Sequence, residues 1–493
     1  MSYVLALDAG TTGVRALAVN PESEIVGLAY REFTQHFPQP GWVEHDLNEI
    51  WDGIVAVLAE LVPSLDEPIA AIGITNQRET AAAWDRRTGR PRHRAIVWQD
   101  RRTASRCDRL AAEGHLDVVR ARTGLVLDPY FTGSKYEWLL TEGAVAADDD
   151  LALGTIDSWL IWKLTDGAVH ATEPSNASRT MLFDIGAVDW SAELCELLSV
   201  PKAALPEVRP SSGRFGLTAD TTALGAGIPI SGVAGDQQAA LFGQACLRPG
   251  MTKNTYGTGS FVLMNVGTSC PEPVDGLLTT VAWTLSEGGP ASYAYEGAIF
   301  VTGAAIQWLR DGLGIIDDAA EIGPLASSVD DTGDVYLVPA FAGLGSPWWD
   351  PYARGTLIGL TRGTGRAELA RAVVEAMAYQ TRDVVDLMAS ASGQPPAELR
   401  VDGGASVMDL LLQLQADQLD VPVTRPANNE TTATGAAYLA GLAEGVWDSP
   451  ADVEAAWRVD RRIEPATDRS VAEARYRRWL EAVERSRSWT LPS

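Results

Sequence analysis

The amino-acid sequence predicts an α/β protein made of two halves that share one plan. Three observations support this prediction. The chain has 493 residues, and chains of this length usually fold as more than one domain, each with its own hydrophobic core. Short apolar runs typical of strands alternate with segments of helical periodicity along most of the chain. A loop rich in glycine and threonine lies between two apolar strands once in each half, so each half is expected to present a similar loop.

The first of these loops lies near the N-terminus. Residues 4–7 and 16–19 are short apolar runs that predict two strands, and the segment between them predicts a tight turn. In that turn, Gly10 and Gly13 are expected to supply the backbone angles that a hairpin loop requires. Residues 70–75 predict a further buried strand, so the N-terminal half is expected to contain a sheet.

A domain boundary is expected where the Pro-Gly pair at 249–250 ends the helical pattern of residues 236–246. We therefore predict an N-terminal domain of residues 1–248 and a C-terminal domain of residues 249–493. The second glycine- and threonine-rich loop follows the boundary at once, at residues 255–260.

Helical periodicity is clearest in two segments of the C-terminal half. Apolar side chains recur at helical spacing through residues 368–388, which predicts a long helix. Near the end of the chain, Tyr476, Trp479 and Val483 fall on one helical face, which predicts an amphipathic helix there.

Composition and charge restrict the class of protein. Hydrophobic residues make up 46% and charged residues 21% of the chain, as in an ordinary folded domain. The net charge of -26 repels nucleic acid and anionic membranes, so neither is an expected partner. Asp8 interrupts the first apolar run too early for a signal peptide, and no run approaches the ~18 apolar residues of a membrane helix. The four scattered cysteines predict reduced thiols, so the expected location is cytoplasmic.

The two glycine- and threonine-rich loops are candidates for binding phosphate. A P-loop is excluded because no lysine follows a glycine. Closely spaced glycines expose backbone N–H groups, Thr11, Thr12 and Thr258 add hydroxyl donors, and Arg15 adds a positive charge. Asp8, at the end of a predicted strand, can hold magnesium. Either loop alone is more simply an ordinary turn, but the pair favours a phosphate clamp.

Three further motifs place polar residues or glycines after a predicted strand or before a predicted helix. Asp236 follows two glycines at a predicted helix start, where it is either an N-cap or a general base for an alcohol. Arg78 and Glu79 offer donors and acceptors to neighbouring hydroxyls, although a surface ion pair is the simpler alternative. The glycine pair in residues 402–405 would let a flat ring approach the backbone, or it forms a plain turn.

Taken together, these motifs resemble the FGGY family of carbohydrate kinases. The resemblance extends over nearly the whole chain and rests on an ordered set of segments. These are residues 8–12, 76–80, 97–102, 128–135, 234–243, 253–259, 343–350 and 402–405.

The resemblance implies two actin-like (ribonuclease-H-like) domains with a catalytic cleft between them. It also implies phosphoryl transfer from ATP, with magnesium, to a small polyol, for which glycerol is the expected acceptor and sn-glycerol 3-phosphate and ADP the products. Asp236 would be the general base and Asp8 the metal ligand. The implied polyol site comprises Arg78, Glu79, Trp98, Tyr130, Asp236, Gln237 and Phe261. The implied nucleotide site comprises Thr11, Thr12, Arg15, Gly257, Thr258, Gly303, Gln307, Gly404 and Met408.

The sequence departs from the family pattern at four places. Ala9 replaces the usual Gln, Gly13-Val14 replaces small polar residues, and Met408 stands where an Asn usually lies near adenine. Residues 221–227 lack the basic, Gly-rich pattern linked to sugar bisphosphate control in some relatives. Two alternatives stay open: a family member acting on another polyol or a pentulose, and a non-enzymatic, actin-like ATP-binding sensor, chaperone or filament subunit. A homodimer or a homotetramer is also left open.

Overall fold

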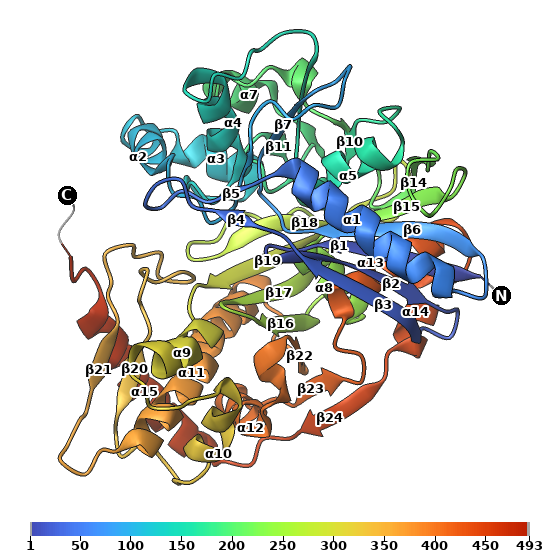
Figure 1. Ribbon diagram of the computed structural model, residues 1–493. Helices are drawn as coiled ribbons and strands as arrows, with labels where there is room; N and C mark the ends of the chain where they lie inside the picture. The colour runs from blue at the N-terminus through green and yellow to red at the C-terminus, as the bar shows by residue number, and fades with distance from the viewer. Residues whose placement is uncertain (1, 491–493) are drawn as a thin grey trace.

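The computed structural model describes residues 2–490 and has two α/β domains, each built on a mixed sheet (Figure 1). In the first sheet, β1 lies between an antiparallel partner and a parallel one, as β16 does in the second. The first sheet has the order β14 (Ser212–Leu217), β15 (Pro229–Gly235), β6 (Ile69–Asn76), β1 (Tyr3–Ala9), β2 (Gly13–Val19) and β3 (Ile25–Glu32).

The second sheet repeats this plan. Hairpin β16–β17 corresponds to hairpin β1–β2, and the parallel neighbour β22 corresponds to β6. The order is β18 (Leu278–Thr284), β19 (Ala291–Ile299), β17 (Ser260–Gly267), β16 (Thr252–Tyr256), β22 (Leu399–Asp402), β23 (Val423–Pro426) and β24 (Val459–Ile463). The two glycine- and threonine-rich loops therefore occupy equivalent hairpins, as predicted.

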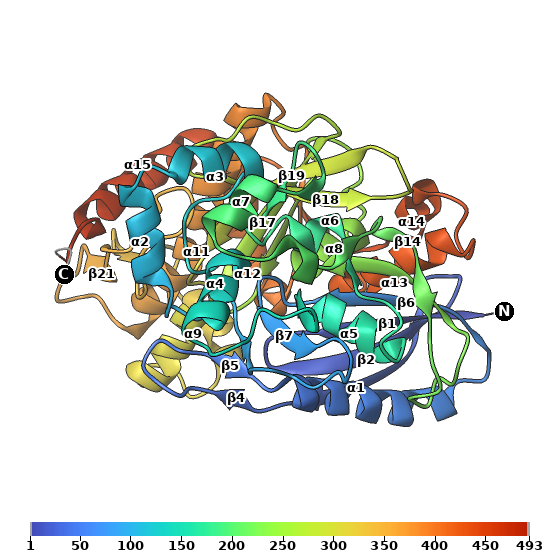
Figure 2. The ribbon, with the colours of Figure 1, turned by 90° about the horizontal axis from the view of Figure 1, so that it is seen from above.

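Helices cover the outer face of each sheet. The first sheet is covered by α1 (Leu47–Leu61) and α5 (Ile156–Leu164), whose apolar side chains join those of the strands in one core. The second is covered by α11 (Arg366–Ser392) and α12 (Asp409–Leu419). The chain termini lie on opposite sides of the molecule in Figures 1 and 2.

Two helices, α8 (Asp236–Gly243) and α13 (Thr431–Ala443), pack between the sheets, so that both sheets share a core with them. They cross with their backbones in contact: a Cβ added to Gly435 would lie 1.9 Å from the carbonyl oxygen of Ala239. A Cβ on Gly73 of β6 would lie 2.2 Å from the carbonyl oxygen of Ala436. A helix from the C-terminal half thus covers the inner face of the N-terminal sheet, and it abuts the helix that begins with Asp236.

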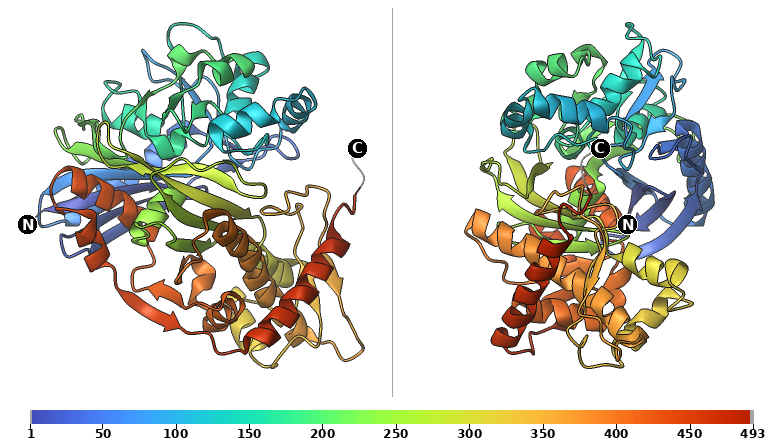
Figure 3. Two further views of the ribbon diagram at one scale, coloured as in Figure 1. Left: turned by 180° about the vertical axis from the view of Figure 1, so that it is seen from behind. Right: turned by 90° about the vertical axis from the view of Figure 1, so that its left-hand side faces the viewer.

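The remaining helices and strands lie outside the two main sheets. The N-terminal half carries β4 (Gln35–His36), β5 (Glu44–His45), β7 (Ala82–Asp85), β8 (Ala95–Ile96), α2 (Ala104–Ala112), α3 (Leu116–Thr123), α4 (Thr132–Thr141), β9 (Leu151–Gly154), β10 (Ala171–Thr172), α6 (Pro174–Ala177), β11 (Phe183–Asp184), β12 (Asp189–Trp190), α7 (Ala192–Leu197) and β13 (Glu207–Val208). The C-terminal half carries α9 (Gly303–Gln307), α10 (Ile322–Ala326), β20 (Tyr336–Val338), β21 (Thr356–Ile358), α14 (Pro450–Ala456) and α15 (Arg469–Ser486). Figure 3 shows α15 on the outside of the C-terminal half, beside β20 and β21.

The predicted strands are confirmed as β1, β2 and β6, and the predicted helices as α11 and α15. The reason given for Gly10 and Gly13 is wrong, because neither adopts a positive φ angle. Gly13 is instead required by packing: a Cβ there would lie 2.6 Å from both the carbonyl oxygen of Arg31 and the Tyr30 hydroxyl oxygen. Within residues 2–490, no helix combines the length and apolar character needed to span a bilayer. All four cysteines are free.

Candidate active site

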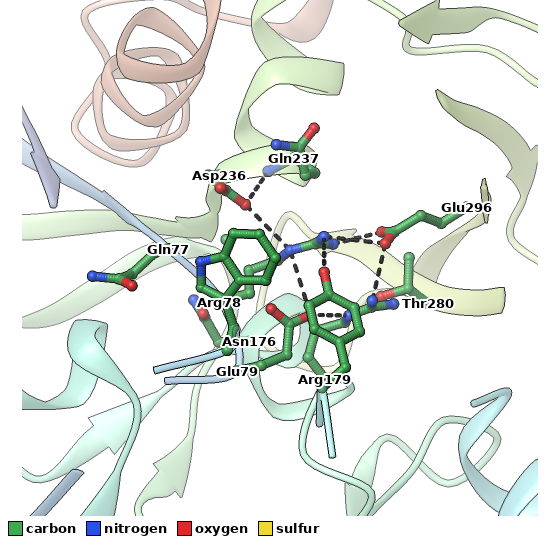
Figure 4. Close-up of polar contacts among 12 residues, drawn as sticks. Gln77, Arg78, Glu79, Asn176, Arg179, Asp236, Gln237, Thr280 and Glu296 are labelled. Carbon is green, nitrogen blue, oxygen red and sulfur yellow. Dashed lines mark hydrogen bonds and ion pairs between the residues drawn. The ribbon is translucent and has the colours of Figure 1, made fainter. Parts of the chain in front are cut away.

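Arg78 lies at the centre of a buried group of charged side chains just beyond the end of β6 (Figure 4). Its Nη1 donates to Glu296 Oε2 at 2.5 Å and its Nη2 donates to Glu296 Oε1 at 3.1 Å, a two-pronged pair. Its Nε lies 3.2 Å from Asp236 Oδ1. The guanidinium therefore joins an N-terminal strand, the start of α8 and a strand of the C-terminal half.

A second buried arginine completes this group. Arg179 Nε donates to Glu79 Oε1 at 2.7 Å, and its Nη2 donates to Glu296 Oε1 at 2.9 Å. Burial opposes the charged form of Glu296, but Arg179 and Arg78 outweigh burial and lower its pKa to about 2. For Glu79, burial outweighs the two arginines and raises the pKa. Two arginines and two glutamates thus alternate in a cluster with almost no exposed surface, which fixes the guanidinium of Arg78.

The sequence interpretation missed Glu296 and Arg179. Glu296 is a single charged residue inside the strand β19, and a glutamate is almost never fully buried unless it is paired. That anomaly was the available signal, but the partner lies 218 positions earlier in the chain. The simpler alternative for Arg78 and Glu79, a surface ion pair, is wrong because both side chains are buried.

Asp236 is the first residue of α8, and Gly235 is the N-cap, so the N-cap alternative for Asp236 is wrong. Glycine is needed at 235 because a Cβ there would lie 2.7 Å from Cδ of Arg78. Asp236 Oδ1 accepts a hydrogen bond from the Gln237 N–H at 2.7 Å. Burial raises the pKa of Asp236, and the positive charges of Arg78 and Lys253 oppose that shift. A partly exposed carboxylate with a raised pKa suits proton acceptance.

Three aromatic side chains line the space beside Asp236. The Trp98 ring meets the Tyr130 ring edge-on at 5.7 Å and the Phe261 ring at 6.5 Å, measured between centroids. The Tyr130 hydroxyl accepts from Arg78 Nη2 at 3.3 Å. The structure therefore gathers all seven residues of the predicted polyol site. Gln237 follows Asp236 on α8 (Figure 4).

The first loop is tied to this site. Trp98 Nε1 donates to Thr11 Oγ1 at 3.0 Å, and Thr12 is exposed at the turn. Arg15 Nε lies 3.2 Å from Asp8 Oδ2, and its Nη1 donates to Glu430 Oε2 at 2.5 Å. Burial raises the pKa of Asp8 to about 6, against the lowering effect of Arg15. Arg15 thus bridges the carboxylates of two halves of the chain.

The donor set around Asp8 is compatible with a magnesium ion held partly by other ligands. Asp8 presents a carboxylate, and the Asp236 carboxylate is close enough to act on it electrostatically. Within the described part of the chain, no three His, Cys, Asp or Glu side chains are gathered as a complete metal site. Magnesium usually keeps several waters and is bound through one or two carboxylates plus phosphate oxygens. The residues present therefore fit that mode of binding and not a closed protein cage.

The second loop meets the start of α9. The Gly303 N–H donates to the Gly257 carbonyl at 3.1 Å, and the Ala304 N–H donates to the Thr258 carbonyl at 3.0 Å. These bonds bring Gly257, Thr258 and Gly303 together, and Gln307 is exposed at the other end of this short helix. No hydrogen bond among residues 2–490 joins this loop to the first loop.

Gly404 and Met408 lie next to the second loop through the neighbouring strand. Gly403 has φ +84°, and a Cβ there would lie 2.4 Å from the carbonyl oxygen of Tyr256, the last residue of β16. Gly404 is exposed, and a Cβ there would meet no heavy atom within 4 Å. Met408 Cγ would lie 3.5 Å from a Cβ on Gly323 of α10. Open backbone at Gly404 is what the approach of a flat ring requires.

Comparison with known proteins agrees with this geometry. Family models described as the FGGY family of carbohydrate kinases match residues 3–243 (N-terminal domain) and residues 252–444 (C-terminal domain). The chain is 55% identical over 500 residues to the glycerol kinase of Bordetella parapertussis, covering 100% of this chain and 98% of that protein. It is 56% identical over 494 residues to the glycerol kinase of Carboxydothermus hydrogenoformans, covering 99% of this chain and 98% of that protein.

Solved structures give the same result at the level of the fold. The Plasmodium falciparum glycerol kinase with ADP superposes with a TM-score of 0.93 at 33% identity, covering 99% of this chain and 98% of that chain. A ligand-bound xylulose kinase from Lactobacillus acidophilus superposes with a TM-score of 0.89 at 19% identity, which shows the fold alone. The resemblance inferred from the ordered motifs is confirmed: the chain belongs to the FGGY family of carbohydrate kinases.

Proposed function

We propose that this protein is a glycerol kinase, which transfers the γ-phosphoryl group of ATP to glycerol and yields sn-glycerol 3-phosphate and ADP. The observation that carries the proposal is the buried cluster of hydrogen-bonding groups around Asp236, with aromatic walls beside it. Full-length relatives at 55–56% identity that are named glycerol kinase support the same activity.

The cluster suits a small polyol. Each hydroxyl of such a molecule both donates and accepts, and the site offers carboxylates of Glu79 and Asp236 beside the nitrogen donors of Arg78 and Gln237. The rings of Trp98 and Phe261 supply apolar contact for the carbon chain. A buried site that pairs every hydroxyl strongly rejects analogues that lack one, because its own groups are then left unpaired.

Asp236 is the proposed general base. Its carboxylate accepts the proton of the reacting hydroxyl as that oxygen forms a bond to the γ-phosphorus. The bond from the γ-phosphorus to the bridging oxygen breaks, and its electron pair leaves with ADP. Burial raises the pKa of Asp236, while Arg78 and Lys253 oppose that shift and favour the charged carboxylate that accepts the proton.

The two hairpin loops are the proposed nucleotide site. Thr11, Thr12 and Arg15 lie on the first-sheet side, and Gly257, Thr258 and Gly303 lie on the second-sheet side. The open backbone at Gly404, together with Met408 and Gln307, is the proposed adenosine side. Asp8 would hold magnesium, which, when bound, neutralises charge on the phosphate groups. When ATP binds, Arg15 must exchange Glu430 for phosphate oxygens, because its Nη1 donates to that carboxylate.

Three further predictions belong to this proposal. They are a domain boundary between residues 248 and 249, a cytoplasmic location, and assembly as a homodimer or homotetramer. Gel filtration with light scattering on the full chain distinguishes the two oligomers.

A coupled ADP-release assay tests the function. The panel contains glycerol, erythritol, xylitol, xylulose and ribulose, with a control that lacks an acceptor. We expect the highest kcat/KM with glycerol and only a small fraction of that rate without acceptor. A pentulose or another polyol as the preferred acceptor would assign the protein to a different branch of its family. ADP release that is absent, or independent of acceptor, would favour the non-enzymatic ATP-binding alternative.

A further inference from the structure

Lys253 is a buried cation next to the proposed base. It lies on β16 of the C-terminal half with none of its surface exposed. Burial lowers the pKa of Lys253 to about 8, although Asp402 and Asp236 favour its charged form. Burying an ammonium group is costly unless its donors are satisfied, so its position calls for a specific set of acceptors.

Those acceptors are oxygen atoms around the start of α8. Lys253 Nζ donates to Gln237 Oε1 at 2.5 Å, to Thr255 Oγ1 at 2.8 Å and to the Phe261 carbonyl at 3.4 Å. An ammonium group has three donors and no acceptor. The atom of Gln237 that faces Lys253 must therefore be the amide oxygen, and the orientation of that amide is determined by chemistry.

The amide nitrogen of Gln237 consequently points away from Lys253. Gln237 Nε2 makes no hydrogen bond to any group of the described residues 2–490. The other nitrogen donors of the site are largely used, because Arg78 Nη1 and Nη2 donate to Glu296 and Tyr130. The Gln237 NH₂ group is thus a free donor beside the Asp236 carboxylate.

We propose that Lys253 is a positioning residue. It holds the side-chain amide of Gln237 so that the NH₂ group points toward the bound polyol. This inference rests on the proposed function. An acceptor hydroxyl can then accept from Gln237 while it donates to Asp236, so a donor and a base act on neighbouring hydroxyl groups or on the same one. Without Lys253 the amide rotates between two states, and in one of them its carbonyl faces the oxygen atoms of the polyol.

The arrangement also assembles the site from both halves of the chain. Gln237 belongs to α8, whereas Lys253 and Phe261 belong to the β16–β17 hairpin. Glu296 on β19 fixes Arg78 in the same manner. Acceptor specificity is therefore set by contacts between the halves as well as by groups that touch the polyol.

The test is a double-mutant cycle in the full-length enzyme with Lys253→Met, Gln237→Ala and both together. Glycerol affinity is measured by calorimetry without nucleotide, and kcat and KM are measured for glycerol and ATP. We expect K253M to weaken glycerol binding about 10- to 100-fold, as the loss of one oriented hydrogen bond does, with little change in the KM for ATP. In the Q237A background, K253M should not weaken glycerol binding further, because Lys253 is proposed to act on glycerol only by orienting the Gln237 amide. Discrimination between glycerol and propane-1,2-diol should also shrink in K253M.

Two controls keep the outcome interpretable. Lys202→Met removes the same charge from a half-exposed lysine and should leave glycerol affinity unchanged. Gln237→Glu keeps an oxygen acceptor for Lys253 and replaces only the NH₂ donor, so it should weaken glycerol binding even if K253M does not fold. Three results would each overturn the proposal. They are unchanged glycerol affinity in K253M, fold-losses of glycerol affinity that multiply in the double mutant, and tighter glycerol binding in Q237E. Absence of glycerol-dependent ADP release in the unaltered enzyme would instead overturn the proposed function.

Discussion

The ionisation of Asp236 is governed by its immediate neighbours. It lies between Arg78 and Lys253, two buried cations, while its own burial acts in the opposite direction and raises its pKa. Under the proposed function, the raised pKa favours acceptance of the proton, and the two cations favour the charged form of the carboxylate before transfer. In the proposed function, the two cations therefore act on the base and not on the phosphoryl group.

Replacing Asp236 with Asn should lower kcat by ~10²–10⁴, the usual contribution of a positioned base. The fold should persist, because Asn retains an oxygen for the Gln237 N–H and because Gly235 is the N-cap of α8. Turnover and the melting temperature Tm are measured together. Asp117→Asn, which changes an exposed acid in the first turn of α3, is the control and should match the unaltered enzyme in both. Near-normal turnover in D236N would remove Asp236 from the role of base.

At this scale the sequence predicted the residues that lie in motifs and missed those whose role depends on a distant partner. Arg78 and Glu79 follow the predicted strand at residues 70–75, and Asp236 starts a predicted helix, so the local motif identifies each of them as a candidate. Glu296 and Arg179 could not be foreseen, because nothing local indicates that β19 reaches Arg78. The reason for Gly13 could not be foreseen either, because its packing partners Tyr30 and Arg31 come from another strand.

Among the elements, α15 is held by one buried carboxylate of α11. Asp383 Oδ1 accepts from the Tyr476 hydroxyl at 2.6 Å, and its Oδ2 accepts from Trp479 Nε1 at 2.9 Å. Both aromatic residues had been placed on one face of the predicted tail helix, and that face is confirmed as the one that packs inward. Hydrophobic periodicity predicts the apolar face of α15, but it cannot reveal that this face packs over the carboxylate of Asp383.

Burial raises the pKa of Asp383 to about 7, against the hydrogen bonds that favour its charged form. Its pKa in the unfolded chain is near 3.8, so between these values the folded protein binds more protons than the unfolded chain. The stability that Asp383 contributes therefore falls as pH rises from about 4 to about 7, by on the order of 4 kcal/mol in total.

Asparagine cannot lose a proton, so Asp383→Asn should abolish this dependence. We expect the Tm of the unaltered protein minus that of D383N to become smaller, or to change sign, between pH 5 and pH 8 in scanning calorimetry. Asp386→Asn, on the same helix but half-exposed, should show no such trend. A Tm difference that is constant or grows with pH would contradict the assignment.

Across the whole molecule, the halves are joined through α8 and α13, whose backbones touch. The residues of the proposed polyol site lie at this junction and are already linked across it by Lys253 and Glu296. The two glycine- and threonine-rich loops, by contrast, share no hydrogen bond among residues 2–490. The duplicated plan was visible in the sequence as two similar loops, but the packing of one half's helix against the other half's sheet was not.

Closure of the cleft is therefore expected to bring the loops together about a pivot near the polyol site and to exclude water from the reaction. Small-angle scattering should show a smaller radius of gyration when glycerol and a non-hydrolysable ATP analogue are both bound than with either alone. Calorimetry on the same samples establishes occupancy. An unchanged radius at full occupancy of both ligands would count against closure.

The position of α13 also matters while the protein is being made. The strands of the first sheet are complete once residue 235 has been added, but the helix that covers their glycine-lined face ends at residue 443. At 5–20 residues per second, a ribosome needs ~10–40 s to synthesise the stretch between them. Throughout that interval the nascent chain carries an apolar sheet surface without the helix that covers it, so chains released early by truncation are the ones most prone to aggregate and most in need of a chaperone.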